Sequence, residues 1–138
     1  MPRYLRILAP VYDLEQFLLV AEQVLAIDAE RLARATKVSL AESALAAPFA
    51  SFEGQDFYDG PVERASILAS RIMRNHPLPD GNKRVALVLM QIYLLEHGWR
   101  LTAAPEDIDR MFRAVAGRQQ SEQDLCAWLT SRVEREVR

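Results

Sequence analysis

The segment HPLPDGNKRVALVLMQIYLL, residues 76–95, decides the fold of this chain because it joins a polar loop directly to a long apolar run. From Val85 to Leu95 only Gln91 is polar, and these eleven residues are too few to cross a bilayer. A helix that is apolar on every side is expected to be buried among other helices. The segment therefore predicts an all-α domain around a buried central helix that ends at Gly98.

Helix start signals on both sides of this segment bring the expected total to about six helices in a compact bundle. Each signal is followed by apolar residues at spacings of three and four, which is the pattern of an amphipathic helix. The signals are Asp13 with Gln16, Ser39 with Glu42, Asp59-Gly60-Pro61, Pro105, and Ser121 with Asp124. Between them, the aromatic stretch from Phe49 to Tyr58 surrounds Glu53-Gly54 and predicts a small β-hairpin flap.

Composition limits the classes of protein that this chain can represent. Its 138 residues are 50% hydrophobic and 26% charged, which predicts one globular domain over 1–138. A formal charge of −2 does not favour nucleic acid or a membrane surface as partner. The single Cys126 excludes an internal disulfide and a cysteine metal cluster. The apolar stretch before Asp13 is too short for a signal-peptide core, so we expect a cytoplasmic protein without export.

The loop from His76 to Arg84 concentrates polar chemistry where the apolar helix begins. Gly81 lets the backbone approach a ligand, and the first N–H groups of a helix lack intrahelical partners and favour an anion. Lys83 and Arg84 add two positive charges, which suits a polyphosphate. Asp80 offers an oxygen ligand for magnesium, and His76 has the chemistry of a general base. The loop therefore predicts a site for a polyphosphate, with magnesium and a general base beside it.

Each of these residues also has an ordinary structural interpretation. A histidine at the end of a helix is often a cap, Asp-Gly-Asn is common in turns, and a Lys-Arg pair is often a solvated surface. Taken singly, each residue is more often structural than catalytic. The combination favours a ligand site, because it occupies nine residues directly before a helix that is too apolar to lie on the surface.

These residues resemble the Fic/Doc (Fido) superfamily, and in particular its death-on-curing branch, whose motif runs His-x-Phe-x-Asp/Asn-Ala/Gly-Asn-Lys-Arg. The chain departs from the motif only at Leu78, where the family usually has Phe, and an apolar Leu should still anchor the loop in the core. The likeness extends through 40–45, 52–56 and 94–98, and it covers roughly residues 12–131. It implies the Fido fold.

The resemblance also implies a role for each residue of the motif. His76 corresponds to the base for the target hydroxyl and Asp80 to the magnesium ligand. Gly81 and Asn82 correspond to the phosphate cradle, and Lys83 and Arg84 to ligands of the phosphate charge. The residues implied for the flap that docks a target segment as an extended strand are Ser51, Phe52, Glu53, Gly54 and Gln55.

The reaction implied by the resemblance depends on Lys83. Relatives that transfer adenylyl groups have glycine at this place, whereas the branch with lysine resembles toxins that phosphorylate a threonine of elongation factor Tu. We therefore expect phosphate transfer from ATP with Mg²⁺, and an antitoxin protein as partner. Transfer of AMP by the same site is the first alternative. A nucleotide-binding or interaction module without catalysis is the second.

Overall fold

The structure, a computed structural model, describes residues 12–136, which form seven α-helices, one 3-10 helix and four short strands. Residues 1–11, 137 and 138 lie outside the described part. The prediction that the apolar stretch before Asp13 is no signal peptide therefore falls mostly on residues that the structure does not describe. The helices are α1 (Leu14–Leu25), α2 (Ala29–Ala35), α3 (Val38–Ala46), η2 (Ala47–Phe49), α4 (Pro61–Asn75), α5 (Asn82–Glu96), α6 (Pro105–Ala116) and α7 (Glu122–Thr130). The strands are β1 (Ser51–Phe52), β2 (Gln55–Asp56), β3 (Trp99–Leu101) and β4 (Val133–Arg135). The predicted all-α fold with a small hairpin is confirmed.

Local capping chemistry determines where several of these helices begin. Asp13 and Ser121 each complete a capping box with the residue three positions on, as predicted. Prolines open α4 and α6 in the first turn, also as predicted. The predicted cap at Ser39 is wrong, because α3 begins at Val38 after Lys37 and has no side-chain cap. A helix can begin without such a cap when tertiary packing supplies its stability.

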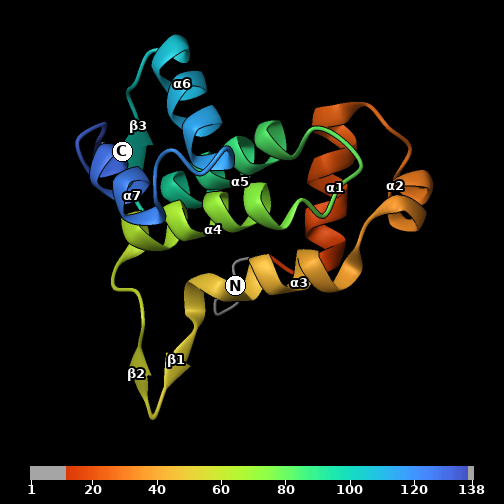
Figure 1. Ribbon diagram of the computed structural model, residues 1–138, viewed down its shortest axis with the longest axis horizontal. Helices are drawn as coiled ribbons and strands as arrows, with labels where there is room; N and C mark the ends of the chain where they lie inside the picture. The colour runs from red at the N-terminus through yellow and green to blue at the C-terminus, as the bar shows by residue number, and fades with distance from the viewer. Residues whose placement is uncertain (1–11, 137–138) are drawn as a thin grey trace.

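Two helices, α4 and α5, form the centre of the bundle (Figure 1). The expected buried helix is α5, whose residues Val85, Ala86, Leu89 and Met90 are fully buried. Its other face is half-buried, and Leu95 is 41% exposed. Helix α4 shares the central position, since it packs against α3, α5, α6 and α7. Among the described residues, no helix is long and apolar enough to span a bilayer.

The end of the chain pairs with the segment after α5. Strands β3 and β4 are antiparallel, with Trp99 opposite Arg135 and Leu101 opposite Val133. The guanidinium of Arg135 lies 4.8 Å from the centre of the Trp99 ring. The charged residues Glu134 and Arg135 thus belong to a strand, for which an alternation as short as three residues gives little local signal.

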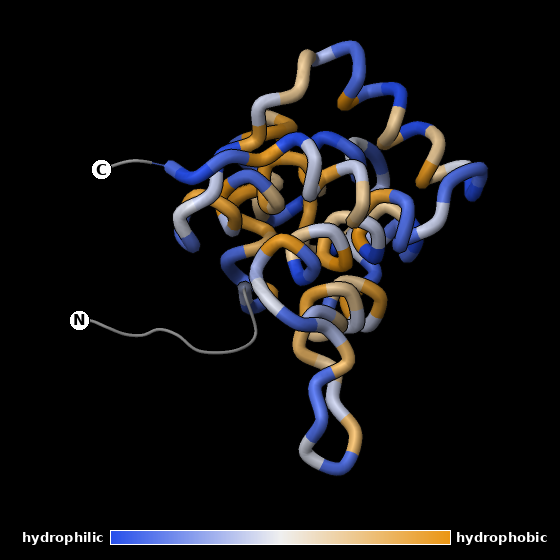
Figure 2. Tube along the Cα trace, turned by 90° about the vertical axis from the view of Figure 1, so that its left-hand side faces the viewer, coloured by the Kyte–Doolittle hydropathy of each residue, from blue (hydrophilic) through white to orange (hydrophobic). Residues whose placement is uncertain are grey.

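Strands β1 and β2 form the predicted hairpin flap, which projects from the helical body (Figures 1 and 2). Ser51 pairs with Asp56 and Phe52 with Gln55. Glu53 and Gly54 both have positive φ, which matches the two-residue turn that the Glu53-Gly54 pair predicted. All four strand residues are exposed, so the hairpin offers unpaired backbone edges to the solvent.

Candidate active site

The polar loop lies between the end of α4 and the start of α5, and its backbone is held at several points. His76 is the C-cap of α4 with φ of +52°, and its N–H donates to the carbonyl of Ile72 at 3.1 Å. The Lys37 N–H donates to the Pro77 carbonyl at 2.9 Å, which ties the loop to the start of α3. The loop therefore has a defined position between two helices.

Leu78 anchors the loop in the hydrophobic core, as the sequence predicted. Its side chain is 1% exposed and belongs to the cluster that includes Leu68 and Ile72. The Leu78 backbone is also held, because its N–H donates to Asn82 Oδ1 at 3.0 Å and its carbonyl accepts from Asn82 Nδ2 at 3.0 Å. Leu in place of Phe thus still fills the core, and the loop closes on the first residue of α5.

Asn82, which the resemblance places in the phosphate cradle, turns its side chain toward the loop itself. The side chain is buried, and its amide is occupied by Leu78 and by His76 Nδ1, which lies 3.2 Å from Asn82 Nδ2. The first intrahelical bond of α5 runs from Val85 N–H to the Gly81 carbonyl. The backbone N–H groups of residues 82–84 therefore have no intrahelical partner. An anion at this helix start would meet backbone donors and not the Asn82 amide.

Lys83 and Arg84 bring two positive charges to the same helix start. Lys83 Nζ lies 3.8 Å from Asp109 Oδ1 on α6, and both side chains are partly exposed. A hydrogen bond from Arg113 lowers the pKa of Asp109, with a smaller contribution from the charge of Lys83. Arg84 is exposed and has no ion pair among residues 12–136. Exposed pairs of this kind are weak, so both cations can turn to a phosphate.

Asp80 lies at the surface next to this cationic helix start, and in the described part of the chain its carboxylate has no ion pair. The same part holds no group of three or more His, Cys, Asp or Glu side chains that could bind a metal by themselves. Magnesium commonly uses one or two protein carboxylates and takes its other ligands from water and substrate phosphates. A single carboxylate at this place fits that ion only if a substrate phosphate and water supply the other ligands.

The structure does not bring the flap next to His76. The hairpin follows α3 and η2 and joins the first turns of α4, where Arg64 Nη2 lies 3.3 Å from Asp56 Oδ2 and 3.2 Å from the Tyr58 carbonyl. His76 caps the opposite end of α4, and fifteen residues of helix span about 22 Å. Figure 1 shows the hairpin below one end of α4 and the loop to α5 at the other.

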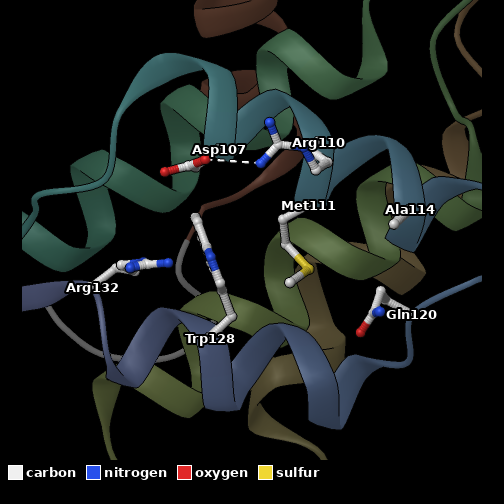
Figure 3. Close-up of a pocket in the computed structure, with 7 residues that line it drawn as sticks. All are labelled: Asp107, Arg110, Met111, Ala114, Gln120, Trp128 and Arg132. Atoms are coloured by element: carbon white, nitrogen blue, oxygen red, sulfur yellow. Dashed lines mark hydrogen bonds and ion pairs between the residues drawn. The ribbon is translucent and has the colours of Figure 1, made fainter.

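A cavity of about 170 Å³ opens between α6 and α7, away from the polar loop. In Figure 3, Trp128 stands between Arg132 and Met111, and an ion pair joins Asp107 to Arg110. The cavity is lined by Asp107, Arg110, Met111, Ala114, Gln120, Trp128 and Arg132. None of the residues predicted for the site lines this cavity, so it is separate from the candidate active site.

Two residues that touch the site escaped the sequence analysis. Asp109 reaches Lys83 from α6, and the side chain of Leu25, from α1, packs over Gly81. Nothing in the local sequence points either residue toward the loop. Asp109, for example, is followed by Arg113 at the ordinary spacing of a helical ion pair. Only the packing of distant helices brings these residues to the loop.

Comparisons with known proteins place the chain in a family. The model of the Fic/DOC family matches residues 11–94, which include the polar loop and most of α5. The protein "Toxin Doc" of Mycolicibacterium smegmatis (strain ATCC 700084 / mc(2)155) is 39% identical over 71 residues, a stretch that spans 51% of this chain and 54% of that relative. The chain thus aligns with about half the length of this relative. No solved structure matches. Because the family model covers more than half of the sequence, this chain belongs to the Fic/DOC family.

Proposed function

We propose that this chain transfers a phosphate group from a nucleoside triphosphate to a threonine or serine hydroxyl of a target protein. The observation that carries the proposal is the loop from His76 to Arg84. It places an imidazole, a helix start without intrahelical partners and two cationic side chains close together in the sequence and at one end of α5. Phosphate transfer needs mainly positioning and neutralisation of charge, and this loop supplies both. The family and the Doc-like relative support the proposal.

The residues of the loop divide the work of such a reaction. The backbone N–H groups at the start of α5 would hold phosphate oxygens, and Lys83 and Arg84 would neutralise their charge. His76 would accept the proton of the attacking hydroxyl. Asp80 would hold Mg²⁺, which supplies further neutralisation of the phosphates when bound. Gly81 allows the backbone to approach the ligand because it carries no side chain.

Lys83 supports phosphate transfer over AMP transfer. By the resemblance described above, relatives that transfer adenylyl groups have a glycine there, which leaves room for phosphate oxygens. Lys83 instead puts a long side chain at this place and brings a charge whose only ion pair within residues 12–136 is the 3.8 Å contact with Asp109. We propose elongation factor Tu as the target and an antitoxin as the partner, on the analogy with the toxin branch alone.

ATP labelled at the α or the γ phosphate separates the two reactions. The purified chain is incubated with Mg²⁺, a bacterial extract or elongation factor Tu, and each label in turn. Label from the γ position alone supports phosphate transfer, whereas label from the α position on the target supports AMP transfer. His76→Ala is the control, and label that persists in this variant would refute the assignment of the base.

The position of the flap favours a second candidate, a nucleotide-binding module without catalysis. The hairpin lies at the opposite end of α4 from His76, so a target docked on its edge has a long distance to reach the loop. Nucleotide binding measured by calorimetry, without label on any target and without growth arrest on expression, would support this candidate. Growth arrest that His76→Ala abolishes would support the transferase.

A further inference from the structure

The orientation of the Asn82 side chain is determined by the backbone of one residue. The Leu78 N–H can only donate, and it lies 3.0 Å from Asn82 Oδ1. The Leu78 carbonyl can only accept, and it lies 3.0 Å from Asn82 Nδ2. Exchanging the oxygen and nitrogen of the amide would place two donors together and two acceptors together. The amide nitrogen therefore faces His76.

This orientation assigns the role of one imidazole nitrogen. Asn82 Nδ2 has two protons; one goes to the Leu78 carbonyl and the other points to His76 Nδ1, which lies 3.2 Å away. A hydrogen bond there requires a bare Nδ1 that accepts. A neutral imidazole with a bare Nδ1 carries its proton on Nε2. We propose that Asn82 is a positioning residue that holds His76 in the Nε2–H tautomer in the free protein.

The consequence concerns the first step of the proposed function, on which this part of the inference rests. In the Nε2–H tautomer the outward nitrogen of His76 is a donor, suited to a phosphate oxygen, and it has no lone pair for a hydroxyl proton. If Nδ1 carried the proton instead, its N–H would face the N–H of Asn82. His76 thus becomes a base only when the Asn82 contact is broken, and ligand binding has to supply that change.

The second histidine of the chain offers an internal reference with the opposite geometry. His97 Nδ1 lies 2.9 Å from the carbonyl oxygen of Tyr93, which can only accept. His97 is therefore an Nδ1–H imidazole in its neutral form. With two histidines in the sequence, one protein contains both tautomers, each set by a single neighbouring group.

The test is a long-range ¹H–¹⁵N correlation spectrum of the full chain labelled on histidine, recorded near pH 9, where imidazoles are neutral. Substitution of each histidine in turn assigns the two spin systems. We expect His76 with a protonated Nε2 and a bare Nδ1, and His97 with the reverse. A His76 spectrum that shows Nδ1–H, or the same mixture of tautomers as free histidine, would overturn the proposal.

Asn82→Asp sharpens this test, because a carboxylate oxygen accepts from the imidazole and should move the His76 proton to Nδ1. The matched control is Asn75→Asp, which also removes an amide donor to a carbonyl, here that of Leu40 at 3.0 Å, next to His76 in the chain. Asn75→Asp should leave both tautomers unchanged. A folded Asn82→Asp protein that keeps Nε2–H contradicts the proposal, and if the variant does not fold, the wild-type spectrum still decides. The spectrum needs no nucleotide. If His76 shows the expected tautomer but the chain transfers no phosphate, the proposed function is rejected and the role of Asn82 stands.

Discussion

Gly81 lies directly under the side chain of Leu25, so closely that a Cβ on Gly81 would be 2.2 Å from Leu25 Cδ2. Gly81 also has φ of +78°, a left-handed conformation that L side chains adopt at a cost. The absence of a side chain at Gly81 thus serves the packing of α1 against the start of α5. The same residue connects the stability of the fold to the geometry of the site.

Gly81→Ala should therefore destabilise the fold more than alanine at a glycine of similar φ with free space around it. Gly54, in the turn of the hairpin, is that control, since it has φ of +79° and no atom within 4 Å of an added Cβ. We expect Gly81→Ala to cost about 1 kcal/mol more than Gly54→Ala in urea unfolding, because Leu25 has to turn away from its packed position. The added substitution Leu25→Ala should relieve the clash. Equal costs at the two glycines would contradict this account.

Leu78→Ala should lower the free energy of unfolding by about 2–5 kcal/mol, because the removed side chain is fully buried and leaves a cavity in the core. The matched control is Leu19→Ala on α1, where the side chain is 51% exposed and the cost should stay near 0.5 kcal/mol. Urea unfolding followed by circular dichroism measures both. A small effect at Leu78 would mean that the loop is anchored by its hydrogen bonds alone.

Lys83→Met should reduce γ-phosphate transfer at least tenfold, because one of the two charges that would neutralise the phosphates is lost. Asp109→Asn is the control, since it removes the ion pair with Lys83 and leaves the ammonium in place. We expect Asp109→Asn to retain transfer within about twofold, because exposed pairs contribute little. If both variants lose activity equally, the pair and not the free ammonium is what the reaction needs.

Glu122 gives the fold a dependence on pH. Burial would raise the pKa of Glu122, but hydrogen bonds from Arg71 and Ser70 outweigh it and hold the pKa below its ordinary 4.5. The charged form of Glu122 therefore stabilises the fold above pH 4.5, and this contribution is lost as the pH falls through the lowered pKa. Glu122→Gln should cost about 1–3 kcal/mol at pH 7 and less at pH 3.

The control for Glu122 is Glu30→Gln, which removes an ion pair with Arg34. The side chain of Glu30 is 82% exposed and that of Arg34 is 67% exposed. Its free energy of unfolding should stay close to that of the wild type at both pH values. Urea unfolding at pH 7 and pH 3 measures the two variants together. If Glu122→Gln lowers the free energy of unfolding as much at pH 3 as at pH 7, the hydrogen bonds of Glu122 stabilise the fold independently of its charge.

Phe52→Ser tests the flap. The Phe52 side chain is 65% exposed, so its loss should change the free energy of unfolding by less than about 0.5 kcal/mol. If a target docks on the β1–β2 edge, the variant should raise the KM for the target and leave the affinity for Mg-ATP unchanged. Leu19→Ser, at an exposed apolar position on α1, is the control. An unchanged KM for the target would argue against docking on this hairpin.

The sequence by itself determined the helical class, several helix starts and the composition of the loop, because these depend on neighbours within a few residues. The capping boxes at Asp13 and Ser121 and the proline start at Pro61 are local interactions, and the structure reproduces them. The burial of Leu78 was expected from the resemblance to the family, which has Phe at this position. The motif from His76 to Arg84 also indicated the family, and the match to the family model confirms it.

The tertiary structure alone decided which residues meet across the fold. The inward turn of the Asn82 amide depends on the path of the Leu78 backbone, and the approach of Asp109 to Lys83 depends on how α6 packs against α5. The pairing of β3 with β4, and the distance between the hairpin and the end of α4, likewise depend on the course of the chain between distant segments. A spacing of a few residues encodes a cap or a turn, whereas contacts between remote residues arise only when the whole core packs.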